Sequence, residues 1–183
     1  METTEKRVET AYSRLGLKEP FIAAVMTRIP RKIDDTVPTA GTDGTCVWYN
    51  PEFAEKCSNA ELFGLVLHES LHVVLMHMWR RGDRDMRLWN YANDAIINAY
   101  IRSRGYSLPE GGVHVNWVTE AMDSETVYRR LKKDEDKAGG PQYDSGGFDG
   151  EGDISDAPTD ATKDDLEATI ASAAQMSKDC GHG

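Results

Sequence analysis

The sequence predicts an α+β fold with a small β-sheet and two long helices, and three local patterns support this class. An Asp-Gly pair between two runs rich in threonine, valine and aromatic residues predicts a β-hairpin over about 36–49, with a tight two-residue turn. Ser58 begins an S-x-x-E capping pattern directly before an apolar run, which predicts a helix over 59–78. A second helical period over 85–103 is followed by a glycine, a common residue after the end of a helix.

The remaining segments are shorter or less regular. The run FIAAVMTRI lies between Pro20 and Pro30 and has the length of a strand, so a strand is slightly favoured over a short helix. Helical spacing is also present over 2–15, 124–131 and 162–177, and a surface loop is expected over 106–117.

Charge divides the chain into two unequal parts. The formal net charge is -10, from 31 acidic and 21 basic residues. Residues 1–133 carry 18 of each sign and are neutral, so the whole excess lies in the last fifty residues. We therefore expect one domain over 1–133, a flexible acidic, glycine-rich linker over 134–161, and a C-terminal helix and tail over 162–183. The acidic balance argues against a nucleic-acid or anionic-membrane binder.

The composition also bears on cellular location. The three cysteines are widely spaced and form no C-x-x-C pair, which favours a reducing compartment. The N-terminus has no apolar signal segment, and the longest apolar stretch, at 62–79, is interrupted by ionisable side chains. These features predict a soluble cytoplasmic protein.

Residues 68–72 read His-Glu-Ser-Leu-His, the H-E-x-x-H pattern. On a helix, His68 and His72 lie four residues apart on one face, so both can bind one zinc ion. Glu69 lies beside that face and can take a proton from a water that the metal activates, without being a ligand itself. The alternative is a pair of core histidines without a metal, which is unfavourable because three ionisable groups would be buried.

Zinc requires a further protein ligand, and two residues are candidates. Asp94 is the centre of a polar stripe, Asn90-Asp94-Asn98, on an otherwise apolar helix, so this face is expected to turn toward a site. Asp94 would then bind the metal through oxygen, and the two asparagines would support the ligands. The alternative is an exposed polar face. His77 lies about 180° from His68 around an unbroken helix, so we expect it to face away and to be structural.

The motifs together resemble a family of metallopeptidase domains often found next to von Willebrand factor A domains. The shared features are TDG…YNP (42–51), HExxHxxxxH (68–77), RR…D…LWNxAxDxxIN (80–98), a Gly/Pro loop (105–112) and an S-E-x-V-Y helix (124–128). The resemblance covers about residues 20–131 and is similar to the gluzincin arrangement, with aspartate in place of glutamate. It implies a zincin-like fold, His68, His72 and Asp94 as metal ligands, Glu69 as the base, and an open role for His77. It also implies a von Willebrand A protein or an AAA ATPase as a partner.

The sequence thus predicts a zinc-dependent metallopeptidase that acts on a peptide or protein substrate. Two alternatives remain: a zinc-binding module without turnover that works with a partner protein, and an amidase with the same metal chemistry. In zincins an edge strand pairs with the extended substrate, and 45–49 is the candidate for this strand. The alternative is that 45–49 only covers the core. Tyr91, Tyr106 and His114 are candidate donors to the reacting carbonyl oxygen.

Overall fold

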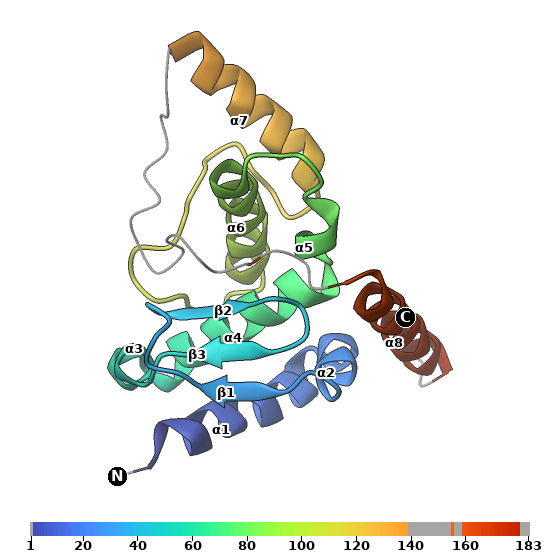
Figure 1. The fold of residues 1–183 in the computed structure, drawn as a ribbon. Coiled ribbons are helices and arrows are strands. Elements are labelled where there is room, and N and C mark those ends of the chain that lie inside the picture. The colour runs from blue at the N-terminus through green and yellow to red at the C-terminus, as the bar shows by residue number, and fades with distance from the viewer. Residues whose placement is uncertain (1, 139–154, 156–158, 180–183) are drawn as a thin grey trace.

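The computed structural model describes residues 2–138, 155 and 159–179 (Figure 1). It confirms the α+β class, with helices dominating and one three-stranded sheet. The elements are α1 (Thr4–Lys18), α2 (Pro20–Met26), β1 (Arg31–Ile33), β2 (Ala40–Thr42), β3 (Val47–Tyr49), α3 (Pro51–Lys56), α4 (Asn59–Val74), α5 (His77–Arg80), α6 (Met86–Ser103), α7 (Ser124–Ala138) and α8 (Asp160–Asp179). Within these ranges, no helix combines the length and the apolar character that a membrane span requires.

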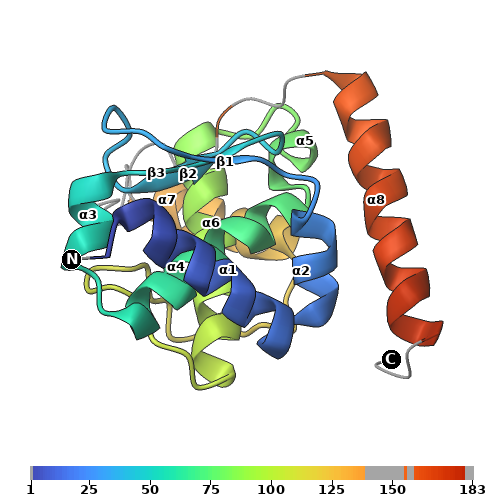
Figure 2. The ribbon, with the colours of Figure 1, turned by 90° about the horizontal axis from the view of Figure 1, so that it is seen from below.

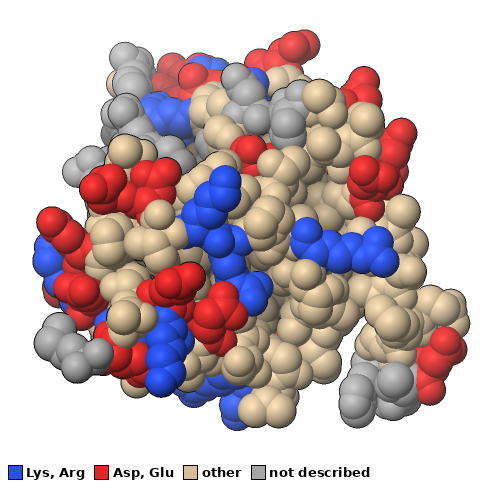
Figure 3. Space-filling model, turned by 60° about the horizontal axis from the view of Figure 1, so that its bottom comes forward, with Lys and Arg blue, Asp and Glu red and all other residues tan. Residues whose placement is uncertain are grey.

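Helix α4 runs through the middle of the molecule. It packs against α1 and α2 on one side and against α6 on the other, and it also contacts β2 (Figures 1 and 2). Helix α8 lies beside α2, and it buries Leu166 and Ala173 in the same apolar cluster as α1, α2 and α4. Most of the predicted linker over 134–161 lies outside the described residues, and the domain boundaries stay a prediction. Acidic and basic side chains are interspersed on the face shown in Figure 3.

The predicted hairpin is present, but its turn is longer than expected. Strands β2 and β3 pair antiparallel, with Thr42 opposite Val47, so the connection has four residues. Asp43 Oδ1 accepts hydrogen bonds from the backbone N–H groups two and three residues later, and Gly44 has a φ of +87°. The two-residue type I′ turn is therefore wrong, because that turn would need a positive φ at Asp43 as well.

The sheet order also changes which strand lies at the edge. The order is β1-β3-β2, with β1 parallel to β3, so β3 is central. The prediction that 45–49 is an edge strand is wrong because both of its sides are already paired. Among the described strands, β1 and β2 form the edges. On β2, the Thr42 carbonyl accepts a hydrogen bond from the Ser155 N–H at 3.2 Å.

Several helix boundaries differ from the expectation. The run after Pro20 forms helix α2 and not a strand, because proline suits the first helical position and Ile22, Val25 and Met26 then share one buried face. The Ser58 capping box is confirmed at the start of α4, but α4 ends at Val74 and not near residue 78. The second long helix, α6, has the predicted bounds.

Candidate metal centre

Helix α4 brings the two histidines of the H-E-x-x-H pattern together. His68 and His72 are fully buried, and their Nε2 atoms are 3.0 Å apart. One turn of helix separates the two residues, so their rings extend from the same face of α4. The predicted pairing of these side chains is present in the folded chain.

Helix α6 brings Asp94 to the same point. Asp94 Oδ1 lies 3.1 Å from His72 Nε2 and 3.6 Å from His68 Nε2, and Asp94 is fully buried. One ligand atom from each of these three residues lies within 4.8 Å of the other two. Asn90 and Asn98 are also buried, so the polar stripe of α6 faces inward and the exposed-face alternative is wrong.

Asn98 fixes the orientation of the His68 ring. Its amide nitrogen donates to the Val113 carbonyl at 3.2 Å, which places its Oδ1 toward His68 Nδ1 at 2.9 Å. An amide oxygen only accepts, so His68 Nδ1 carries the proton. His68 Nε2 is then left with a lone pair that faces Asp94 and His72, as a metal ligand requires.

His77 lies beside the cluster, and the prediction that it faces away is wrong. Its ring is fully buried, with Nδ1 3.1 Å from His72 Nδ1. The reason is a break in the helix: Met76 adopts a left-handed conformation with φ +56° and ψ +36°, and α5 begins at the next residue. Neither glycine nor proline marks this break in the sequence. The only signal was the histidine of the family pattern HExxHxxxxH.

The electrostatics of the cluster favour a cation. Burial raises the pKa of Asp94 to about 6, although the neighbouring His68 partly opposes this shift. Burial lowers the pKa of His72 and His77 well below the usual range, and the neighbouring histidines lower them further. Neither oxygen of Asp94 has a hydrogen-bond partner with suitable geometry among the described residues.

The donor set therefore fits a divalent metal ion. Two imidazole nitrogens and one carboxylate oxygen converge where all three side chains are fully buried, and a buried carboxylate without a hydrogen-bond donor is costly. A bound cation would offset this cost, and histidine nitrogen with carboxylate oxygen is a ligand set that zinc accepts.

The comparisons with known proteins agree with this geometry. A family model described as "Putative metallopeptidase domain" matches residues 3–182. The chain belongs to this family. It is also similar to a Thermotoga maritima protein named "Uncharacterized protein", with 29% identity over 106 residues. The match covers 53% of this chain and 26% of that relative, so the chain spans about a quarter of the relative's length. No solved structure matches the chain.

Glu69 directly follows His68 and is the candidate general base. It is 1% exposed and lies near a buried tyrosine pair, Tyr12 and Tyr49, whose hydroxyl oxygens are 2.9 Å apart. Burial is the main cause that raises the pKa of both phenols, and the negative charge of Glu69 adds to it. Sequence reasoning did not identify these tyrosines because they belong to other elements, α1 and β3.

The structure also shows the surroundings of Asn93 and of the three predicted donors to a reacting carbonyl. Asn93, which the sequence analysis did not single out, is fully buried, and neither of its amide atoms has a hydrogen-bond partner in the described chain. Of the predicted donors to a reacting carbonyl, Tyr106 donates instead to Glu19 at 3.0 Å, and His114 is exposed. Tyr91 is half-buried on α6, one turn before Asp94.

Proposed function

We propose that this chain is a zinc-dependent metallopeptidase of zincin-like design that hydrolyses a peptide bond in a peptide or protein substrate. The observation that carries the proposal is the buried convergence of His68 Nε2, His72 Nε2 and Asp94 Oδ1 in a member of a metallopeptidase family. Three protein ligands are typical of catalytic zinc sites, whereas structural zinc sites are usually closed by four.

Each residue then has a defined role. His68, His72 and Asp94 would hold the ion, while Asn98 keeps the His68 imidazole oriented. Zinc, when bound, polarises the substrate carbonyl and lowers the pKa of water. Glu69 accepts the proton of the attacking water and delivers it to the departing amine.

A second function is favoured by one specific observation. His68, His72 and Asp94 have no exposed surface in this structure. A closed site fits a metal ion that stabilises the fold of a binding module, and the resemblance to the family suggests a von Willebrand A protein or an AAA ATPase as its partner. A peptidase instead requires the surrounding chain to open when substrate binds.

Digestion of a broad peptide library by the zinc-loaded protein distinguishes the two functions. The peptidase predicts cleavage by the wild type and a loss on the order of a hundredfold or more in Glu69→Gln, with the metal retained. Glutamine is nearly isosteric but cannot accept the proton. Glu52→Gln, an exposed carboxylate on α3, is the matched control and should keep full activity. A wild type that binds zinc and cleaves no peptide would favour the binding module.

A further inference from the structure

We propose that His77 is a positioning residue for the ligand His72, and that Ser124 at the start of α7 anchors it. This inference rests on the proposed function to the extent that His72 binds a metal ion. It assigns a role to the one buried histidine of this region that is outside the three-residue metal set.

The order of protons along the three side chains supports this role. To bind a metal through Nε2, His72 must carry its proton on Nδ1, and that atom lies 3.1 Å from His77 Nδ1. His77 Nδ1 then accepts this proton in a hydrogen bond, so the proton of His77 itself is on Nε2. That nitrogen lies 3.3 Å from Ser124 Oγ, which can accept it. Both hydrogen bonds, from His72 to His77 and from His77 to Ser124, therefore have one donor and one acceptor.

The opposite order is incompatible with metal binding. If Ser124 donated to His77 Nε2 and His77 Nδ1 donated to His72, the proton of His72 would be on Nε2. That atom is the one that faces His68 and Asp94. When Ser124 accepts from His77 Nε2, His77 therefore favours the His72 tautomer with its proton on Nδ1. Hydrogen-bond partners of metal-bound histidines generally fix the tautomer in this way.

The backbone holds His77 in this place at a local cost. Met76 is the one non-glycine residue with positive φ in the part of the chain that the structure describes. This conformation is unfavourable for a side chain with a Cβ, so other contacts must maintain it. Trp89 Nε1 donates to the His77 carbonyl at 2.9 Å, and the two rings pack edge to face with centroids 6.2 Å apart.

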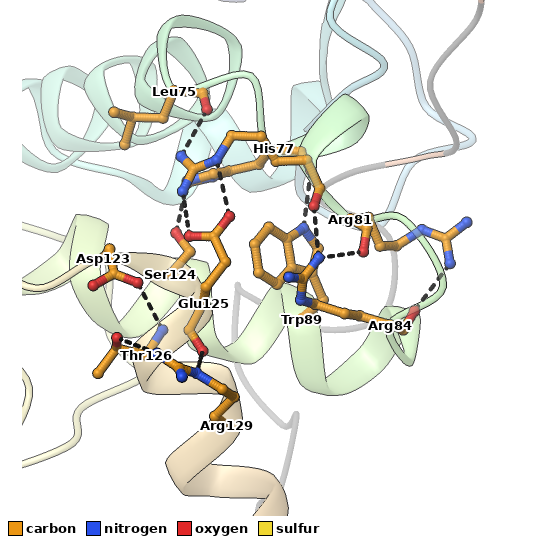
Figure 4. A network of polar contacts seen from close by, with 11 residues as sticks. Leu75, His77, Arg81, Arg84, Trp89, Asp123, Ser124, Glu125, Thr126 and Arg129 are labelled. Atoms are coloured by element: carbon orange, nitrogen blue, oxygen red, sulfur yellow. Dashed lines mark hydrogen bonds and ion pairs between the residues drawn. The ribbon is translucent and has the colours of Figure 1, made fainter.

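Helix α7 is fixed to the same turn (Figure 4). Arg80, in α5, donates to Glu125 through Nη2 at 2.6 Å and through Nε at 3.3 Å. Its Nη1 also donates to the Leu75 carbonyl at 3.0 Å, at the end of α4. Glu125 follows Ser124 directly, so this ion pair places the buried Ser124 hydroxyl against His77.

His77 is less suited to be a ligand itself. The nitrogen that it turns toward the cluster meets the His72 ring at Nδ1, whereas His72 faces the other two ligands with Nε2. His77 thus contacts the far side of the ligand and not the ligand atoms of the cluster.

The test compares His77→Asn and His77→Leu in the full chain, because asparagine and leucine have nearly the same shape. Asparagine Oδ1 can accept from His72 Nδ1 as the imidazole does, and leucine cannot. We expect zinc affinity, measured by competition with a chelator, to fall 10- to 100-fold in His77→Leu. His77→Asn should bind zinc at least fivefold more tightly than His77→Leu, and Ser124→Ala should show a smaller loss. The exposed His114→Gln serves as the control.

Two further readings separate this role from its rivals. Unfolding by denaturant without metal reports the stability of each variant, and the absorption spectrum of the cobalt-substituted protein reports its ligands. A purely structural role predicts equal zinc affinities for the Asn and Leu variants, and a ligand role predicts an altered cobalt spectrum in both; either result would overturn the proposal. A wild type that binds no metal would refute the proposed function itself.

Discussion

Replacing Asp94 with asparagine should affect metal binding and the stability of the metal-free protein in opposite directions. The substitution keeps the shape of the side chain and removes its charge. In the structure, Asp94 is fully buried, Oδ1 lies 3.1 Å from His72 Nε2, and the carboxylate has no hydrogen-bond donor of suitable geometry among the described residues. The metal-free fold therefore buries an acid whose charged form the neighbouring His68 stabilises only in part.

The expected magnitudes follow from this geometry. Structural zinc sites provide about 10–16 kcal/mol of binding free energy. If three ligands share it, Asp94 contributes roughly 3–5 kcal/mol, which corresponds to a loss of zinc affinity of about 10²- to 10⁴-fold in Asp94→Asn. Without metal, replacing an unsatisfied buried carboxylate should leave the free energy of unfolding unchanged or raise it by about 1 kcal/mol.

Two measurements on the same samples check this prediction. Chelator competition gives the zinc affinity, and urea unfolding in the presence of excess chelator gives the stability of the metal-free protein. Asp123→Asn is the control, because the Asp123 side chain accepts from the Thr126 N–H at the start of α7 and takes no part in the cluster. A zinc affinity within threefold of wild type in Asp94→Asn would refute Asp94 as a ligand. A metal-free variant destabilised by about 2 kcal/mol or more would show that the carboxylate is a structural element.

Three other perturbations test separate parts of the structure. The pKa is lowered for His72 and His77 and raised for Asp94, so below pH 6.5 the unfolded chain gains two protons at the histidines while the folded chain gains one at Asp94. Stability without metal should thus fall by on the order of 1 kcal/mol per pH unit between pH 6 and 5, measured by urea titration; a rise on acidification would contradict these shifts. Gly64→Ala should destabilise by about 1–3 kcal/mol despite the better helix propensity of alanine, because the added Cβ overlaps a backbone carbonyl of the loop after α6. Leu166→Ala should lower the free energy of unfolding by about 2–4 kcal/mol and leave zinc affinity unchanged, because α8 buries Leu166 in the main core. If the variant unfolded at the same temperature as the wild type, α8 would be dispensable for stability.

The parts of the site that the sequence predicted well are those that depend on helical spacing. His68 and His72 lie on one buried face of α4 because they are four residues apart. The same rule places Asp94 and Asn98 on the inward face of α6. Local periodicity and a capping box were sufficient for these residues, since the contacts in question lie along single helices or between two long ones.

The errors arise where contacts distant in sequence decide the local conformation. At the end of α4, Trp89 of the next long helix, α6, donates to the His77 carbonyl, and the nearby Arg80 donates to the Leu75 carbonyl. These hydrogen bonds satisfy two carbonyl groups that a continuous helix would pair internally, so they support the left-handed conformation of Met76. No glycine near this position indicates the break in the sequence. The central position of β3 likewise depends on its pairing with β1, which comes earlier in the chain.

The central claim is that His68, His72 and Asp94 hold one metal ion. Elemental analysis of the purified protein after exposure to zinc and removal of the excess tests it most directly. We predict about one zinc ion per chain in the wild type and none in the folded His68→Ala, His72→Ala double variant, with folding checked by circular dichroism. Stoichiometric zinc in that variant, or a folded wild type that retains no zinc, would contradict the account.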